Sequence, residues 1–438
     1  MLNKTNYNRH VTNVNAHTQT KRPRDPRLDF FRGLGMFIIY IAHVPWNWWT
    51  LWIPARFGFS DATEIFVFCS GMASALAFGK IFDVHGWGIG AARIAHRMWQ
   101  VYWAHIGQFL IIAVGLFMVH QSGYLERCCD LTQDYVVSLN LWHLFNNTEQ
   151  ALPGIMTLTW VPNYFDILPM YVVILALIPV IMLASRVSVV AAFAVSIGMW
   201  LASQFGYLDL PAEPWSDRKW FFNPFAWQML FFTGFAFMRG WIPAPPVNRK
   251  LIVLCAAIVL LTIPFAYFRV YSASYWDFEW AREIRAYIKP LWIKTEFGLF
   301  RYLHFLALAY LGWIAAGEHG KYLLGHGKVW GAFVRVVQKV GQQSLAVFMA
   351  SLVIAQAAAL MRDMVWGRGE WLPQILSNFG GFAALVAVAY VVSWYKSQPW
   401  RKPPKTAAGG LGTPEAPPKA APPTPNINEV SAKEPALT

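Results

Sequence analysis

The chain has 438 residues, of which 56% are hydrophobic and only 13% are charged. Soluble domains carry about 25% charged residues, so this composition excludes an ordinary soluble enzyme and predicts an integral membrane protein. The net charge of +13 does not indicate nucleic-acid binding, because the cations lie in short segments between hydrophobic runs and in the two tails. The cysteines have no metal-type spacing and predict neither a metal site nor a disulfide framework: Cys69, Cys128, Cys129 and Cys255.

The two ends of the chain differ from its middle. Residues 1–27 are polar and basic, and the first apolar run, near Leu28, is followed by further apolar runs. We therefore interpret that run as a retained span and not as a cleaved signal peptide. Residues 401–438 are rich in Pro, Ala and Lys, which predicts a disordered cytoplasmic tail. The expected domains are a basic segment at 1–27, a transmembrane domain at 28–400 and the tail.

The middle of the chain predicts an all-α fold, a bundle of membrane-spanning helices. A span needs about 20 mostly apolar residues, and such runs predict about ten crossings. They lie at 30–50, 61–80, 99–119, 165–184, 188–206, 223–240, 250–268, 299–316, 341–361 and 376–395. With the N-terminus inside, Lys and Arg collect in the inside connections, whereas the outside loop at 120–164 is mainly acidic. We therefore expect both termini in the cytoplasm.

The first span, in LDFFRGLGMFIIYIAHVPWNWW, contains ionisable residues, which are costly inside a membrane and mark functional sites. Asp29 and Arg32 are three residues apart and share a helix face. Arg32 and His43 also share a face, roughly 16 Å apart along the helix axis. Such a face could bind an anion at Arg32 and carry out proton chemistry at His43. Alternatively, Asp29 and Arg32 pair at the interface and His43 only bonds to a neighbouring helix.

Two acids are expected at the depth of His43. In SDATEIFVFCSGM, Glu64 is the candidate to orient the His43 ring, because a carboxylate on one imidazole nitrogen makes the other a better base. Alternatively, Glu64 is a helix-start acid stabilised by the helix dipole. In VPNYFDILPMYVV, Asp166 lies at the outside entrance of the fourth predicted span. We expect these side chains to meet near the outer surface.

Arg93 and Arg97 lie one helical turn apart in GIGAARIAHRMWQVYWAH, at the expected cytoplasmic surface. Two guanidinium groups on one face suit phosphate binding, although they would also satisfy the positive-inside pattern without a ligand. The polar residues alone leave three classes of function open. These classes are an enzyme, a proton-coupled small-molecule transporter and a protein with merely packed polar side chains. The internal repetition common in transporters is not detected.

Taken together, these motifs resemble a known group of membrane enzymes. LDFFRGLGMFIIYIAH resembles the opening motif of the acyltransferase 3 type, an Arg, ten residues and a His. DATEIFVFCSGM and ARIAHRMWQVYWAH resemble its second-span and third-span elements. YFDILPMYVV, FNPFAWQMLFFTGF and GQQSLAVF look most like the OpgC branch, and the resemblance runs from about Arg24 to Trp400.

The resemblance implies a bacterial inner-membrane O-acyltransferase. Such an enzyme would move an acyl group, succinyl in the OpgC type, from cytoplasmic acyl-CoA to a hydroxyl of an osmoregulated periplasmic glucan. His43 matches the catalytic histidine and Arg32 its paired arginine. Arg93 and Arg97 match the arginine motif only loosely, since their spacing differs, and Asp166 replaces a Glu. The histidine of the group's final conserved span is absent from GQQSLAVFMAS.

This family reading assigns expected roles to six residues. His43 would be the general base that deprotonates the acceptor hydroxyl. The other two members of the expected catalytic set are acids, Glu64 and Asp166. The CoA phosphates would be bound by Arg32, Arg93 and Arg97. The outside loop at 120–164, with Trp142, His143 and Tyr164, is either a platform for the glucan or a structural lid. The expected partners are therefore the lipid bilayer, acyl-CoA and a carbohydrate, with no metal.

Overall fold

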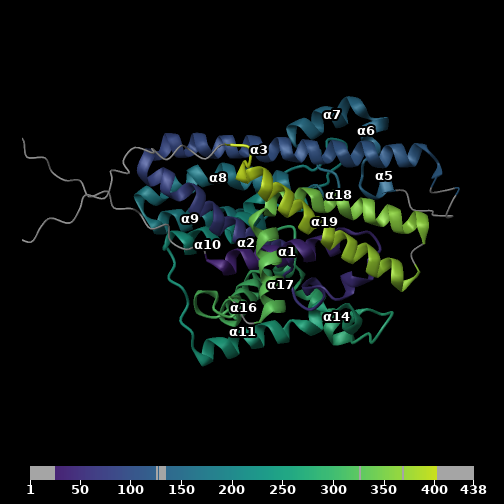
Figure 1. Cartoon of the computed structure of the whole chain (residues 1–438). Helices are drawn as coiled ribbons and strands as arrows, with labels where there is room; N and C mark the ends of the chain where they lie inside the picture. The colour runs from purple at the N-terminus through teal and green to yellow at the C-terminus, as the bar shows by residue number, and fades with distance from the viewer. Residues whose placement is uncertain (1–24, 125–126, 128–134, 325–326, 367–368, 402–438) are drawn as a thin grey trace, which may run out of the picture. The chain divides into compact units, whose positions relative to one another are not determined.

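The computed structural model describes residues 25–124, 127, 135–324, 327–366 and 369–401 (Figure 1). The basic segment at 1–27 and the tail at 401–438 therefore lie almost wholly outside the described residues. Within these ranges the chain is helical, and its extended pairing is one isolated bridge between Pro211 and Lys219. The prediction of an all-α protein is confirmed. The chain divides into two units, Met1–Ser393 and Trp394–Thr438, and the helices discussed below belong to the first, except for the last four residues of the helix Trp371–Ser397.

Each of the ten predicted spans overlaps a helix. These helices are α1 (Pro26–His43), α2 (Ala62–Ser74), α3 (Lys80–Gln121), α8 (Ile167–Val187), α9 (Val189–Gln204), α10 (Pro224–Arg239), α11 (Arg249–Leu261), α16 (Leu299–Ala315), α18 (Ser344–Val365) and α19 (Trp371–Ser397). Among the described residues, five helical segments are long and apolar enough to cross a membrane: Ala62–Gln121, Ile167–Val187, Arg249–Ala266, Ser344–Val365 and Trp371–Ser397. The apolar helices indicate a membrane protein, while the number of crossings stays a prediction.

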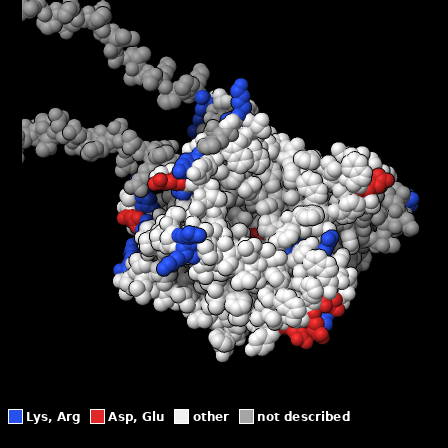
Figure 2. All heavy atoms as spheres, turned by 90° about the horizontal axis from the view of Figure 1, so that it is seen from below, with Lys and Arg blue, Asp and Glu red and all other residues white. Residues whose placement is uncertain are grey.

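The protein itself covers little of the apolar surface of some helices. Of the 18 residues in Arg249–Ala266 only 11% are buried, and Leu254, Leu260 and Leu261 are all exposed. Figure 2 shows one face on which most charged side chains lie towards the left and right, with a broad, mostly uncharged area between them. Large exposed apolar areas are rare on soluble proteins. Contact with lipid accounts for them here.

Helix α1 lies between α2, α17 and α18. It begins at Asp25, whose side chain accepts a hydrogen bond from the backbone N–H of Arg27. It ends at His43 because the next residue, Val44, is extended, as is usual before a proline such as Pro45. The position of His43 at the end of the helix therefore follows from the local sequence.

Helices α2 and α10 cross at close range through glycine. A Cβ atom at Gly71 would lie 1.9 Å from the carbonyl oxygen of Phe231. A Cβ atom at Gly234 would lie 2.3 Å from the carbonyl oxygen of Phe68. Small residues allow helices to approach in this way inside a membrane. Gly71 and Gly234 are therefore required for the close packing of α2 on α10.

A glycine turns the chain between α2 and the long part of α3. Helix α2 continues through a π-helical turn, η3 (Ala75–Gly79), into α3. Gly86 has φ 81° and ψ 174°, a conformation that only glycine adopts readily, and the ring of Phe82 then lies against Gly90. From Trp87 to Gln121 the helix measures about 52 Å, more than the ~30 Å thickness of a bilayer core. Part of α3 therefore extends beyond the lipid.

Shorter helices occupy the connections. They are α5 (Tyr135–Ser138), α6 (Trp142–Asn146), α7 (Thr148–Thr157), α12 (Ile263–Ala266), α13 (Phe268–Tyr271), α14 (Glu279–Tyr287), α15 (Lys289–Trp292), α17 (Lys328–Gln342) and the 3-10 turns η1 (Trp48–Leu51), η2 (Pro54–Arg56) and η4 (Glu318–Gly320). Two connections without helix, 208–222 and 293–298, contribute to the cavity described next.

Candidate active site

A cavity of about 960 Å³ lies where α1 ends and where α2 and α8 begin. The loops 208–222 and 293–298, the turns η1 and η2, and Phe348 of α18 form further parts of its wall. Its ionisable lining residues are His43, Arg56, Asp61, Asp166, Asp217, Arg218, Lys219 and Lys294. Two of the six residues proposed from the sequence, His43 and Asp166, thus share one cavity. Volumes of roughly 300–1,000 Å³ are usual for ligand pockets.

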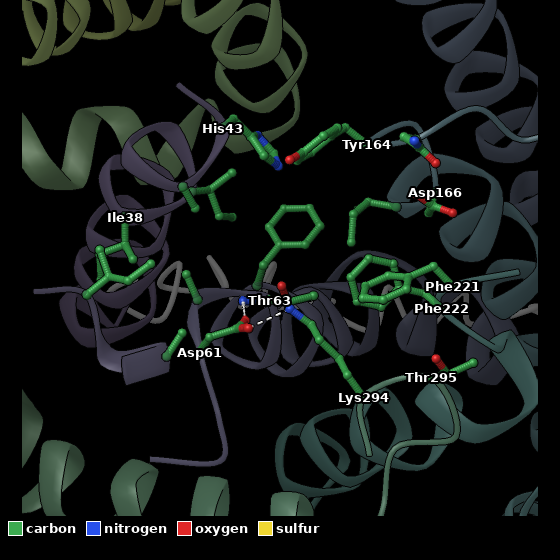
Figure 3. A pocket seen from close by; sticks show the side chains of 18 of the residues that line it. Ile38, His43, Asp61, Thr63, Tyr164, Asp166, Phe221, Phe222, Lys294 and Thr295 are labelled. Atoms are coloured by element: carbon green, nitrogen blue, oxygen red, sulfur yellow. Dashed lines mark hydrogen bonds and ion pairs between the residues drawn. The ribbon is translucent and has the colours of Figure 1, made fainter. Parts of the chain in front are cut away.

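His43 is held in the cavity wall by aromatic packing. Its ring meets the ring of Tyr164 edge-on, with the centroids 5.7 Å apart, and lies 6.4 Å from the ring of Phe348. Figure 3 shows His43 and Tyr164 facing each other on one side of the pocket. The buried Nδ1 atom of His43 has no hydrogen-bond partner among the described residues. Packing, and not a hydrogen bond to Nδ1, therefore orients this ring.

An ion pair lies on the opposite side of the pocket (Figure 3). Asp61 accepts hydrogen bonds from the Thr63 backbone N–H at 2.7 Å and from the Lys294 Nζ atom at 2.5 Å. Burial by itself would raise the pKa of Asp61. The cations Lys294 and Arg301 outweigh it and hold the pKa of that carboxyl below its usual range. Asp61 is therefore an ionised carboxylate of the cavity that is paired with Lys294.

Glu64 occupies a different position from the one expected. One of its oxygens accepts a hydrogen bond from the Asp61 backbone N–H at 2.7 Å, which completes a capping box at the start of α2. The other oxygen is paired with Arg301 of α16 at 2.5 Å. Glu64 is fully buried and does not line the cavity. The hydrogen bond expected from Glu64 to His43 is not present, because a helix cap and Arg301 hold the carboxylate, as the helix-start alternative suggested.

Asp166 is the acid of the cavity that is free to exchange a proton. It lies immediately before α8 and is 5% exposed, and its Oδ1 atom has no hydrogen-bond partner among the described residues. Burial raises the pKa of Asp166 to about 7, although Arg218 acts in the opposite direction. A carboxyl group that titrates near neutral pH is suited to general acid–base chemistry.

Arg32 lies on the same face of α1 as His43 but does not line the cavity. Its guanidinium donates a hydrogen bond to Ser344 Oγ at the start of α18. One turn further along α18, the ring of Phe348 stacks on Phe66 of α2, with the centroids 5.3 Å apart. Both rings line the cavity. Arg32 and His43 are therefore separated by helix length and by this pair of rings.

The structure does not bring Arg93 and Arg97 to the cavity. Both lie on α3. Arg93 is exposed, and Arg97 is partly buried and donates a hydrogen bond to Gln100 Oε1 at 3.1 Å. The binding of CoA phosphates by Arg32, Arg93 and Arg97 therefore stays a prediction.

Sequence reasoning missed a buried ion pair beside His43. Arg362 of α18 is 1% exposed, and its Nη2 atom donates to the Pro45 carbonyl oxygen and to Asp363 Oδ1, each at 2.9 Å. The Tyr135 hydroxyl donates to the other oxygen of Asp363. Pro45 follows His43 by two residues, so this pair anchors the turn that carries the histidine. Adjacent Arg and Asp inside an otherwise apolar helix were the available signal.

Comparison with known proteins identifies the family. A family model described as OpgC protein matches residues 24–397. No curated protein matches the chain, and no solved structure does. The match covers well over half of the chain and includes every helix around the cavity. The chain therefore belongs to the OpgC family, and this membership indicates an acyltransferase-like enzyme that modifies periplasmic glucans.

Proposed function

We propose that this protein transfers an acyl group, succinyl, from cytoplasmic acyl-CoA to a hydroxyl group of a periplasmic glucan, with His43 as general base. The observation that carries the proposal is the cavity itself. It places an imidazole held by packing, His43, in one enclosed space with a carboxyl of raised pKa, Asp166. A deep site with an available base and several cations suits transfer to an alcohol of an anionic acyl group.

The chemistry needs one base and one protonated leaving group. His43 removes the proton from the acceptor hydroxyl while the hydroxyl oxygen attacks the carbonyl carbon of the thioester. The C–S bond then breaks, and the protonated imidazole returns the proton to the CoA sulfur. The products are an ester and free CoA thiol. Asp166 stabilises the protonated imidazole or exchanges a proton with the acceptor.

The donor would approach along α1. Its phosphates would lie near Arg32 at the cytoplasmic end, with Arg93 and Arg97 as further candidates. The acyl end would run along the stripe of α1 that contains Ile39 and His43, since these positions share the helix face of Arg32. The acceptor would enter the cavity from the periplasm. Both chain termini would then be cytoplasmic in the inner membrane.

The proposal is tested with the purified full chain reconstituted in liposomes. Isotopically labelled succinyl-CoA and periplasmic glucan are supplied, and labelled glucan is counted. We expect His43→Ala to lower kcat by about 10²–10⁴-fold, the contribution of a general base. His85→Ala is the matched control, because His85 is exposed on α3 and outside the cavity. Wild-type rates of glucan labelling from the His43 variant would overturn the mechanism.

The donor and the reaction class are tested by thermal unfolding. We expect succinyl-CoA to raise the thermal-unfolding midpoint of the purified protein by more than acetyl-CoA does. A proton-coupled transporter would instead respond to its transported solute and not to acyl-CoA. Labelling of glucan from acetyl-CoA in preference to succinyl-CoA would refute the proposed acyl group while leaving the enzyme class intact.

A further inference from the structure

A second hollow lies beside the cavity. Its volume is about 300 Å³, and it is lined by His120, Val137, Asn140, Trp142 and His143. Its residues come from the end of α3, from α5 and from the start of α6. The proposed chemistry at His43 does not involve any of them.

The side chains of this hollow have the character of a sugar-binding site. The Trp142 ring is 45% exposed and meets the His120 ring edge-on, with the centroids 6.3 Å apart. The His143 ring stacks on the ring of Trp215, a residue of the loop 208–222, with the centroids 4.2 Å apart, and this contact holds His143 in place. The C–H faces of sugar rings pack on exposed aromatic faces, and an amide such as Asn140 can bond hydroxyl groups.

Two segments of chain connect the two hollows. In the first, Ser138 lines the cavity, while Val137 and Asn140 line the second hollow. The Ser138 carbonyl oxygen also accepts a hydrogen bond from the side chain of Asn163, another cavity residue. The two spaces are therefore separated by little more than one turn of backbone.

The second shared segment is the loop 208–222. Its Trp215 braces His143 of the hollow, while its Arg218 lines the cavity. Glu213 joins the two sides, since it accepts a hydrogen bond from Asn140 at 3.1 Å and is paired with Arg218 at 3.0 Å. A ligand in one space would thus contact the same framework as a ligand in the other.

We infer that the aromatic hollow around Trp142 is a second carbohydrate subsite, which binds a sugar ring of the acceptor polymer beside the ring that is acylated in the cavity. The inference rests on the proposed function and specifies its acceptor as a chain of several linked sugars. A single sugar would fill only the cavity, whereas a longer oligosaccharide would also occupy the hollow. Trp142 therefore acts in acceptor binding and not in the chemical step.

The test compares acceptors of different length in Trp142→Ala. With a linear glucose oligosaccharide, we expect KM to rise about tenfold, which corresponds to ~1.4 kcal/mol, with kcat little changed. With glucose the rise should be several times smaller. Trp142→Phe keeps an aromatic face and should recover most of the affinity, which separates loss of the ring from misfolding. Trp276→Ala is the matched control, because Trp276 is an exposed tryptophan outside both hollows.

Binding is also measured without any acyl donor, by titrating the full chain with the oligosaccharide and following heat release. We expect a dissociation constant about tenfold higher for Trp142→Ala than for the unsubstituted chain. Equal binding by both proteins, or equal changes in KM for short and long acceptors, would overturn the inference. Because this measurement needs no acyl transfer, it stands even where the proposed function fails.

Discussion

The buried pair of Arg362 and Asp363 is predicted to hold in place the turn that follows α1 and carries His43. The Arg362 guanidinium donates to the carbonyl oxygens of Pro45, at 2.9 Å, and Trp46, at 3.5 Å. These two carbonyl groups lie in the turn after α1, outside any helical hydrogen-bond ladder, so a buried cation can satisfy them. Replacing Arg362 with Met removes these donors and also breaks the ion pair that Arg362 makes at 2.9 Å with Asp363, which is 1% exposed.

The size of the effect follows from burial. Removing one partner of a buried ion pair costs about 3–5 kcal/mol of unfolding free energy, because the other charge is left in an apolar environment. Replacing both residues, as in Arg362→Met with Asp363→Leu, should recover most of this loss, since an apolar pair of similar volume needs no compensation. The acyl-transfer rate should not recover, because the Pro45 carbonyl group loses the hydrogen bond from Arg362 and the His43 turn is no longer anchored.

The assay is denaturant unfolding in detergent, followed by tryptophan fluorescence, together with the glucan-labelling rate. Arg239→Met is the control, since the side chains of Arg239 and Asp83 are 20% and 50% exposed, and a partly exposed pair should contribute only about 0–1 kcal/mol. Two results would refute the reasoning. One is an Arg362→Met variant as stable as the Arg239→Met control. The other is a double variant that regains full transfer activity.

Two further predictions concern the helix crossing and the ion pair of the cavity. Gly71→Ala should lower the unfolding free energy by about 1–3 kcal/mol or more, the cost of overpacking, because the new Cβ atom would lie 1.9 Å from the Phe231 carbonyl oxygen. The control is Gly88→Ala, whose Cβ atom would meet nothing within 4 Å and which should be nearly neutral in the same thermal-unfolding assay. Because the pKa of Asp61 is lowered in the folded protein, its carboxylate stabilises the folded state at pH values above its unfolded pKa of about 3.9. This stabilisation is lost as the pH falls below that value. Asp61→Asn should therefore be less stable at pH 6 and lose less stability between pH 5 and pH 3, and an unchanged acid profile would contradict this.

The helices and part of the site could be predicted because they depend on local sequence. Each of the ten apolar runs overlaps a helix of the structure, and the spacing of Arg32 and His43 placed both on one face of α1. Asp166 was found because an acid at the start of an apolar run is conspicuous. The Gly86 turn was not predicted, since it depends on a single residue with positive φ inside a continuous helical pattern.

The partners of the site residues could not be predicted, because they are distant in the sequence. Glu64 is paired with Arg301, which lies 237 positions further along the chain, and not with His43. Lys294, which binds Asp61, comes from the loop 293–298, and no pattern in the sequence indicated that this loop lies at the cavity. Sequence spacing specifies which residues share a helix face, whereas the choice among several helices of comparable apolarity depends on packing.

The stacked rings of Phe66 and Phe348 have a consequence for the electrical insulation of the membrane. An enzyme with substrates on both sides of a bilayer contains polar groups along much of its thickness, and a continuous file of water between them would conduct protons. One charge crossing a potential of 100 mV dissipates about 2.3 kcal/mol. Two apolar rings with centroids 5.3 Å apart, at the point between Arg32 and His43, leave little room for such a file. The rings lie on the route proposed for the acyl arm, so they would have to separate for the arm to pass and would close this path to water between turnovers.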